Sequence, residues 1–264
     1  HFANRMGQEL KAVGINLDFA PCVDVFTNPA NTVIGDRSIS SDPETVARHA
    51  SALVRGDVKA EVLTCAKHFP GHGNTIVDSH LDLPVENLDL ERLESCELIP
   101  FKKSFKARVD MVMTSHIKFP KIDAEWPVTL SEKFIQKIIR EECRYKGLII
   151  TDDLGMKAMS AHFPVDEIPV RALKAGVDLL LYCNEFDIPP QAIDAILDAT
   201  AQGTLDKAQL EQSHKRILEV KKAKIPNPDP LELSEVVKIV GHAEHLKIAT
   251  AIANGTVPDG LLPE

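Results

Sequence analysis

The sequence predicts an α/β protein whose strands form a parallel sheet, either a barrel or a doubly wound sheet. Five short runs rich in Val, Ile and Leu recur along the 264 residues, and longer amphipathic stretches separate them. Strands that alternate with helices pair in parallel through right-handed crossovers. The length suits one large α/β barrel or two modest domains.

Each predicted strand is short, is dominated by aliphatic residues and is bounded by a helical pattern. The five strands are predicted at Asn16–Ala20, Val62–Lys67, Asp110–Ser115, Gly147–Asp152 and Val177–Cys183. A complete (β/α)8 barrel has eight strands, and the first element of this chain is already a helix. We therefore expect a barrel that lacks its first βα unit or units in this chain.

The predicted helices have recognisable starts or a repeating apolar face. Asp42 provides an N-cap, and Pro43 and Glu44 suit the first turn that follows it. Ser131 precedes a stretch whose apolar residues recur at helical spacing, namely Phe134, Ile135, Ile138 and Ile139. The remaining helices are predicted at Phe2–Val13, Gln191–Ala201, Asp206–Lys222 and Ala243–Ala253, with Gly203 separating two of them.

The composition changes after Lys224, where alternating prolines predict a linker. We expect residues 1–224 to form the barrel. Residues 225–264 are expected to form the linker and a short helical segment, which ends in the polar tail Val257–Glu264.

Composition and charge disfavour several classes of protein. Hydrophobic residues make up 44% and charged residues 26%, which is typical of a soluble globular chain. No apolar run approaches the ~18 residues of a membrane span, and a net charge of −9 disfavours a nucleic-acid partner. The five cysteines include no C-x-x-C pair, so we expect buried thiols in a reducing, cytoplasmic compartment. A secreted or periplasmic location stays open, and a monomer is favoured.

The densest polar segment, Lys67–His80, follows the second predicted strand and contains one Lys and three His. A solvated loop is the ordinary explanation, and convergence of His68, His72 and His80 on a metal is a second one. The segment has no H-E-x-x-H pattern, and glycines interrupt it, so ligands would not stack on one helical face. Asp78 and His80 are two residues apart and point the same way in extended backbone. That arrangement suits a general acid/base with a carboxylate partner.

The segment Leu148–Met156 ends a wholly apolar strand with two acids, Asp152 and Asp153. Either acid could be the N-cap of the following helix. One suffices for that role, which leaves the other as a candidate nucleophile at the mouth of a barrel. Periodicity does not choose between them, because both faces of a covered parallel sheet are apolar.

Two further segments place polar residues after predicted strands. Arg37 lies in Val33–Ser38, and taken alone it is a surface charge. Met113–His116 ends a strand in a histidine that is typical of a core or supporting position. Because catalytic groups of barrels come from the carboxyl ends of the strands, all these segments are expected to meet at one end of the sheet.

Together, these residues resemble a known family. The run Lys-His-Phe-Pro-Gly-His-Gly-x-Thr-x-x-Asp-Ser-His at Lys67–His80 is similar to the signature of β-N-acetylglucosaminidases in glycoside hydrolase family 3, such as the NagZ-type β-hexosaminidases of peptidoglycan recycling. The segments Ile34–Ser38, Met113–His116 and Thr151–Met156 fall in the family's order and spacing. The resemblance covers roughly residues 1–224.

The resemblance implies a retaining glycoside hydrolase on a (β/α)8 TIM-like barrel. Asp152 matches the family's nucleophile, and His80 matches its general acid/base on a mobile loop, with Asp78 as partner. The residues that match sugar-binding positions are Arg37, Lys67 and His68. The implied substrate is a carbohydrate with a terminal β-linked N-acetylglucosamine, from peptidoglycan-derived or chitin-type glycosides. No cofactor and no metal are expected.

Two alternatives to hydrolysis are compatible with the same residues. Some relatives are proposed to transfer the glycosyl group to phosphate, and a histidine acid/base suits that reaction because a second carboxylate would repel the incoming anion. A non-catalytic sugar-binding protein on the same scaffold is the other alternative. The presence of both Asp152 and His80 argues against it.

Overall fold

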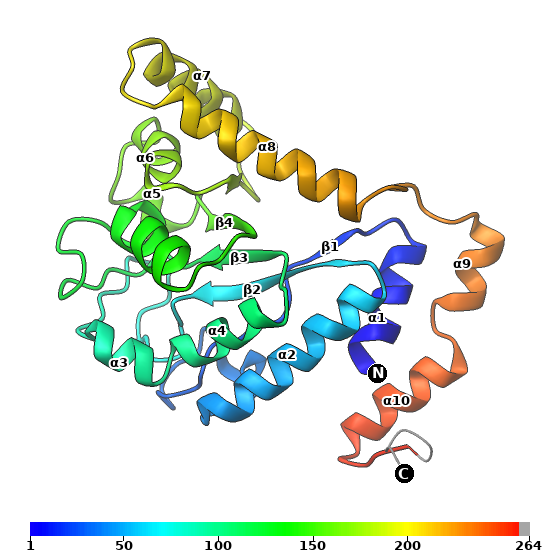
Figure 1. Ribbon diagram of the computed structural model, residues 1–264. Coiled ribbons are helices and arrows are strands. Elements are labelled where there is room, and N and C mark those ends of the chain that lie inside the picture. Colours follow the sequence, from blue (N-terminus) through cyan, green and yellow to red (C-terminus); the bar gives the residue numbers. More distant parts are fainter. Residues whose placement is uncertain (259–264) are drawn as a thin grey trace.

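The protein forms a five-stranded parallel sheet whose strands follow one another in chain order (Figure 1). The structure, a computed structural model, describes residues 1–258. The strands are β1 (Leu17–Asp18), β2 (Leu63–Phe69), β3 (Met111–Thr114), β4 (Leu148–Asp153) and β5 (Leu179–Leu181). All five predicted strands are confirmed, with ends that differ by one or two residues. The two edge strands are the shortest, because each pairs with a single neighbour.

The strand order distinguishes the two predicted kinds of sheet. In a doubly wound sheet the order reverses at a switch point, whereas in a (β/α)8 barrel each strand pairs with the next one along the chain. Within the described residues, the order runs from β1 to β5 without reversal. The sheet is therefore part of the wall of a TIM-like barrel, as predicted, and the described chain supplies five of its strands.

Helices precede, connect and follow the strands. Those in the described residues are α1 (Phe2–Ala12), η1 (Gly35–Arg37), α2 (Pro43–Lys59), α3 (Leu90–Ser95), α4 (Leu98–Lys106), η2 (Val128–Leu130), η3 (Lys133–Glu142), α5 (Lys157–Ser160), α6 (Glu167–Ala175), α7 (Ile188–Ala201), α8 (Lys207–Lys224), α9 (Leu233–Ile239) and α10 (Ala243–Ala253). The predicted N-cap is confirmed, because the Asp42 carboxylate accepts a 2.8 Å hydrogen bond from the Thr45 N–H. The helix predicted after Ser131 has π geometry and begins at Lys133.

The outer face of the sheet carries the main hydrophobic core. Ala66, Val112 and Ile149 from three adjacent strands point to this face and pack with residues of the surrounding helices, including Val54 of α2 and Phe101 of α4. Figure 1 shows α2 and α4 side by side below the sheet. Where helices cover a face of the sheet, the strand residues that point to that face are expected to be apolar.

The inner face of the sheet has its own apolar cluster. Its buried members are Leu63, Cys65, Met111, Met113, Leu148 and Ile150. Ile217 and Val220 of α8 pack against this cluster, so the helix covers part of the inner face. The buried Asp178 carboxylate anchors α8, since it accepts a 2.8 Å bond from Arg216 on that helix and a 2.7 Å bond from Arg140 on η3. Paired arginines are what make a buried carboxylate tolerable.

The segment that follows α8 returns to the first helix. Residues 225–232 contain the predicted prolines, and α9 and α10 then pack beside α1 (Figure 1). The His245 imidazole pairs with the Glu9 carboxylate at 2.6 Å, and the Leu231 N–H donates to the Ala12 carbonyl. The α10 boundaries agree with the prediction, whereas α9 was not predicted. The last six residues of the predicted tail, 259–264, lie outside the described residues.

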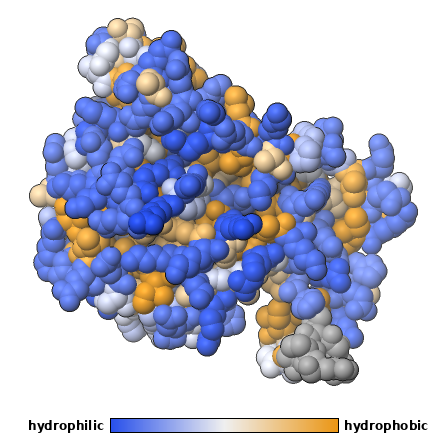
Figure 2. Space-filling model, viewed as in Figure 1, coloured by the Kyte–Doolittle hydropathy of each residue, from blue (hydrophilic) through white to orange (hydrophobic). Residues whose placement is uncertain are grey.

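Most of the visible surface is polar. Figure 2 shows hydrophilic side chains over most of the face, with hydrophobic patches around its centre and over the region of α9. Exposed apolar residues on α9 and α10 include Leu233, Val237 and Leu246. Through residue 258, none of the helices combines the length and the apolar character that a membrane span requires.

Candidate active site

Polar side chains gather at the carboxyl ends of β2, β3 and β4. Lys67 and His68 lie near the end of β2, His116 follows β3, and Asp152 lies near the end of β4. This is the end of the barrel at which catalytic groups are found, because loops leaving adjacent parallel strands converge there.

Asp152 combines burial with access to solvent. Its side chain is 20% exposed, and its Oδ2 lies 3.9 Å from Nε2 of His68. Burial by itself would raise the pKa of this carboxyl group. The charges of His68 and Lys67, together with the Asp153 N–H that donates to Oδ1 at 2.8 Å, hold the pKa below its usual value. Asp152 is therefore an ionised carboxylate at neutral pH, as a nucleophile needs to be.

Asp153 has a different environment. Its Oδ1 accepts from the N–H groups of Gly155 at 3.0 Å and Cys183 at 3.2 Å, and its Oδ2 accepts from the Asn184 side chain at 3.3 Å. The residue is buried, and these bonds join the turn after β4 to the segment after β5. The structure thus separates the two acids that the sequence left equivalent: Asp153 is structural, and Asp152 faces the polar cluster.

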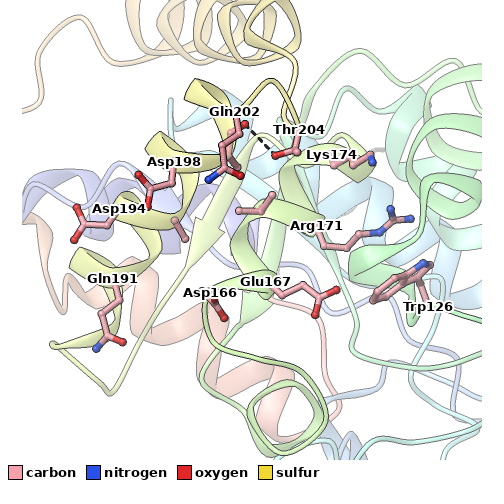
Figure 3. Close-up of a pocket in the computed structure, with 13 residues that line it drawn as sticks. Trp126, Asp166, Glu167, Arg171, Lys174, Gln191, Asp194, Asp198, Gln202 and Thr204 are labelled. Atoms are coloured by element: carbon pink, nitrogen blue, oxygen red, sulfur yellow. Dashed lines mark hydrogen bonds between the residues drawn. The ribbon is translucent and has the colours of Figure 1, made fainter.

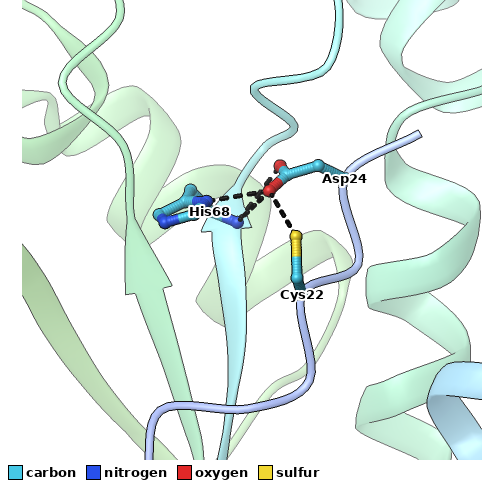
Figure 4. Close-up of side chains that lie close together, drawn as sticks. All are labelled: Cys22, Asp24 and His68. Carbon is cyan, nitrogen blue, oxygen red and sulfur yellow. Dashed lines mark hydrogen bonds and ion pairs between the residues drawn. The ribbon is translucent and has the colours of Figure 1, made fainter. Parts of the chain in front are cut away.

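Asp24 holds the backbone and the ring of His68 in place, although the sequence did not single it out. This fully buried carboxylate accepts from the backbone N–H groups of His68 and His72. Its Oδ2 also accepts from Nδ1 of the His68 ring at 2.8 Å (Figure 4). Burial would raise its pKa, but the charge and hydrogen bond of His68 outweigh burial and lower it. The signal that could have found it was an acid within the apolar run Val23–Val25.

His72 supports the loop and does not reach Asp152. The Thr75 hydroxyl donates to the His72 carbonyl, so the ring donates to Thr75 from Nδ1 and accepts from the Ser79 hydroxyl at Nε2. Burial lowers its pKa to about 4, with a smaller contribution from the charge of His68, so the ring is neutral. It fixes the position of Ser79, which lies between Asp78 and His80.

Asp78 and His80 are in contact as predicted, but a turn rather than the expected extended backbone brings them together, since the Leu81 and Asp82 N–H groups donate to the Asp78 carbonyl. The Asp78 Oδ1 accepts from both the backbone N–H and the ring Nδ1 of His80, each at 2.8 Å. The His80 side chain is 64% exposed, and the bonds that the structure shows for this pair do not extend to Asp152. The Ala158 N–H nevertheless donates to the Ser79 carbonyl, so the loop lies against the segment that follows β4.

Two glycines shape the buried first half of this loop. A Cβ at Gly73 would collide with the Val25 carbonyl, and Gly71 has a φ of +138°, a conformation that L side chains rarely adopt. Both residues are buried, whereas Ile76, Val77 and His80 are exposed. The loop is therefore held closely at its start, whereas several side chains of its second half are exposed.

The three residues that match sugar-binding positions differ in how close they lie to this cluster. Lys67 and His68 act on Asp152 through their charges, and both come from β2. Arg37 lies in the exposed helix η1, and its guanidinium donates to the Val33 carbonyl at 2.6 Å. Burial raises the pKa of the Cys22 thiol well above its usual value, and the charge of Arg37 opposes that rise only weakly. The structure shows no bond from Arg37 to Asp152 in the described chain.

His116 occupies the supporting position that the sequence suggested. Its Nε2 donates to the Asp153 carbonyl at 3.0 Å, and its Nδ1 lies 2.8 Å from the Thr129 hydroxyl. Burial lowers its pKa, so the ring is neutral at neutral pH. It holds the backbone at the end of β4 in place and thereby positions Asp152.

A separate cavity of about 660 Å³ lies between α6 and α7 (Figure 3). Its lining includes Trp126, whose ring packs against the guanidinium of Arg171 at 4.5 Å and against Phe163. The lining does not include Asp152 or any residue of Lys67–His80. The cavity is therefore distinct from the polar cluster at the strand ends.

Comparison with known proteins identifies the family of the chain. Residues 1–220 match the family described as the glycosyl hydrolase family 3 N terminal domain. The chain belongs to glycoside hydrolase family 3. Beta-hexosaminidase A of Pseudoalteromonas piscicida is 34% identical over 283 aligned positions, which cover 99% of this family 3 chain and 47% of that protein.

Two solved structures superpose on the chain closely. A family 3 beta-N-acetylglucosaminidase from Paenibacillus sp. str. FPU-7 has a TM-score of 0.83 at 39% identity, covering 90% of this family 3 chain and 47% of its own. The beta-glucoside phosphorylase BglX has a TM-score of 0.89 at 29% identity, covering 100% of this chain and 51% of its own. The chain thus spans about half the length of these relatives.

Proposed function

We propose that this chain carries the catalytic site of a retaining β-N-acetylhexosaminidase, which removes terminal β-linked N-acetylglucosamine from peptidoglycan-derived or chitin-type glycosides. The observation that carries the proposal is the environment of Asp152, an ionised and partly exposed carboxylate beside His68 at the end of β4. The similarity to beta-hexosaminidases supports the choice of sugar.

The proposed reaction has two steps. Asp152 attacks the anomeric carbon, so the bond to Asp152 forms while the bond to the leaving oxygen breaks, and His80 gives that oxygen its proton. His80 then takes a proton from water, which attacks the same carbon and releases Asp152. Asp78 accepts from Nδ1 of His80, which leaves Nε2 for proton transfer and favours the cationic ring.

The remaining residues of the site bind and orient. Lys67 and His68 are proposed to hold the hydroxyl groups of the sugar, and Arg37 is proposed to contact it from the η1 side. Asp24 keeps the His68 ring in place through the Nδ1 bond, which directs Nε2 towards Asp152. No cofactor takes part in the proposed reaction.

Replacement of each acid at the end of β4 tests the assignment of the nucleophile. We expect Asp152→Ala to lower the hydrolysis of an activated aryl β-N-acetylglucosaminide by roughly 10⁴-fold or more, as loss of a covalent nucleophile does. Asp153→Ala should mainly lower the melting temperature, because it removes the bonds to Gly155 and Cys183. An inactive Asp153→Ala protein beside an active Asp152→Ala protein would refute the assignment.

The leaving group tests the role of His80. His80→Ala should lower the cleavage of a natural β-1,4-linked sugar strongly, because its alcohol needs a proton to depart. The same variant should cleave a dinitrophenyl glycoside at nearly the wild-type rate in the first step, and azide or formate should partly restore the second step. Equal losses on both substrates would mean that His80 only holds the loop.

Transfer to phosphate is the second candidate, and one observation favours it. The phosphorylase BglX superposes on the whole chain with a TM-score of 0.89. A histidine acid/base also avoids the charge repulsion that a second carboxylate would impose on phosphate. Turnover measured with and without inorganic phosphate decides between the two, because only a phosphorylase forms the sugar 1-phosphate.

We also propose the setting in which this site works. Residues 1–224 form the catalytic barrel portion and residues 225–264 the linker and helical segment, and the protein acts as a monomer in the cytoplasm. The five free cysteines, Cys22, Cys65, Cys96, Cys143 and Cys183, support a reducing compartment. Size-exclusion chromatography and fractionation of cells that produce the protein test the oligomeric state and the location.

A further inference from the structure

We propose that Cys22, Asp24 and His68 form a binding site for a thiophilic divalent cation, such as Zn²⁺ or Cd²⁺, and that occupation of this site inhibits the enzyme. The three residues offer a thiol sulfur, a carboxylate oxygen and an imidazole nitrogen, which lie within 4.8 Å of one another. Binding of the cation is independent of the proposed function, whereas inhibition rests on it.

The backbone brings the three groups to one point. Cys22 and Asp24 are two residues apart in the segment that runs parallel to the end of β2, so their side chains share one side (Figure 4). The Asp24 Oδ2 lies 3.2 Å from the Cys22 sulfur and 2.8 Å from Nδ1 of His68. Ligand bonds to zinc of ~2.0–2.3 Å place tetrahedral ligand atoms roughly 3.3–3.8 Å apart, so a small outward movement makes room for the ion.

The donor set selects the class of cation. Thiolate and imidazole ligands favour Zn²⁺ and related soft ions, whereas Mg²⁺ and Ca²⁺ require oxygen ligands in larger number. The Cys22 side chain is only half-buried, while the Asp24 carboxylate is fully buried. Of these two ligands, Cys22 is therefore the more accessible to an ion.

Binding exchanges protons for the ion. The sulfur–hydrogen bond of Cys22 breaks, a sulfur–metal bond forms, and the proton passes to solvent. At His68 the Nδ1–hydrogen bond breaks, a nitrogen–metal bond forms and that proton also passes to solvent, so the remaining ring proton resides on Nε2. The positive ion replaces the hydrogens that the thiol and Nδ1 now direct at the Asp24 oxygen.

Occupation of the site changes the group that faces the nucleophile. His68 Nε2 lies 3.9 Å from Asp152 Oδ2. The movement that makes room for the ion shifts this ring relative to Asp152, so the ring is no longer placed to bind a sugar hydroxyl. The expected result is a slower reaction, which a chelator restores.

Cadmium titration tests binding without any need for activity. We expect the ultraviolet absorption of a cadmium–thiolate bond to saturate at one equivalent in the wild-type chain. Cys22→Ser should abolish that band and weaken Cd²⁺ binding by more than about 100-fold, since even loss of outer contacts to a metal site costs ~10–100-fold. Cys183→Ser is the matched control, because it removes an exposed thiol outside the cluster and should leave the band unchanged.

A second variant separates a built site from a single reactive thiol. His68→Gln keeps Cys22 but removes the imidazole, so the affinity for Cd²⁺ should fall at least about tenfold in a protein whose circular dichroism is unchanged. Equal affinity in the wild-type and His68→Gln proteins would overturn the proposal. A band that survives in Cys22→Ser would overturn it as well.

Inhibition by Cd²⁺ is measured in a separate assay of the hydrolysis rate. One equivalent of Cd²⁺ should lower the rate of the wild-type and Cys183→Ser proteins at least about tenfold, and chelation should restore both. The rate of Cys22→Ser, relative to its own value without Cd²⁺, should not change. If the chain binds Cd²⁺ as expected but hydrolyses no glycoside, the proposed function fails and the metal site stands. Binding without inhibition in an active enzyme refutes the link to catalysis.

Discussion

Asp57 on α2 should make the protein less stable as the pH rises. Its side chain is buried, and neither carboxylate oxygen finds a hydrogen-bond partner among residues 1–258. Helix α1 packs over it, since a Cβ at Gly7 would lie 3.3 Å from the Asp57 Oδ1. Burial, with a smaller contribution from the charge of Asp18, raises the pKa of Asp57 from 3.8 to about 7.

The raised pKa determines the direction and the size of the effect. In the folded protein the carboxyl group holds its proton to about pH 7, whereas in the unfolded chain it loses the proton near pH 3.8. Stability is therefore full below pH 3.8 and falls as the pH rises through about 7. A difference of about three pH units at about 1.4 kcal/mol each sets a ceiling of ~4 kcal/mol. Roughly two-thirds of this loss of stability occurs between pH 5 and pH 8. Partial hydration of the carboxylate reduces the loss over that interval to about 2 kcal/mol.

Asp57→Asn removes the charge and keeps the shape. The free energy of unfolding of the variant and of the wild type is measured in urea at pH 5 and at pH 8. The variant's excess over the wild type should be about 2 kcal/mol larger at pH 8 than at pH 5. Asp36→Asn, which alters an exposed acid, serves as the control and should change the free energy of unfolding by less than about 0.5 kcal/mol at either pH. A gain of Asp57→Asn that is the same at both pH values would falsify the reasoning.

Three further outcomes are expected. Proton NMR of the first product should show the β-anomer of N-acetylglucosamine, because two displacements retain configuration, and early α-anomer would exclude a covalent intermediate. Prolonged chelation should not lower the rate, because proton transfer and sugar binding account for the histidines; a loss that zinc reverses would contradict this. Asp78→Asn should lower the cleavage of β-1,4-linked sugars less than His80→Ala does, because the ring remains but loses its charged partner. If the rates measured across a pH profile fell as much as in His80→Ala, or more, the role of Asp78 as a partner of His80 would be contradicted.

The features that the sequence predicted depend on residues close together in the chain. The aliphatic runs located the strands, because a strand buried on both faces needs apolar residues on each of them. Asp42 identified the start of α2, because a cap bonds to an N–H three residues away. The Asp78–His80 contact was also predicted from a spacing of two, although a turn rather than extended backbone brings the two side chains together. Resemblance to family 3 then indicated a role for Asp152 that periodicity alone left open.

The features that only the tertiary structure decided depend on partners far apart in the chain. Asp153 is structural because Cys183 and Asn184 reach it from the loop after β5, and no local pattern contains that information. Asp24 became visible as the support of the site only when β2 placed His68 beside it, 44 residues later. The choice between a barrel and a doubly wound sheet likewise required the pairing order of the strands. Local hydrogen bonds and apolar periodicity specify elements, whereas the surroundings of a buried carboxylate are set by whichever distant strands pack against it.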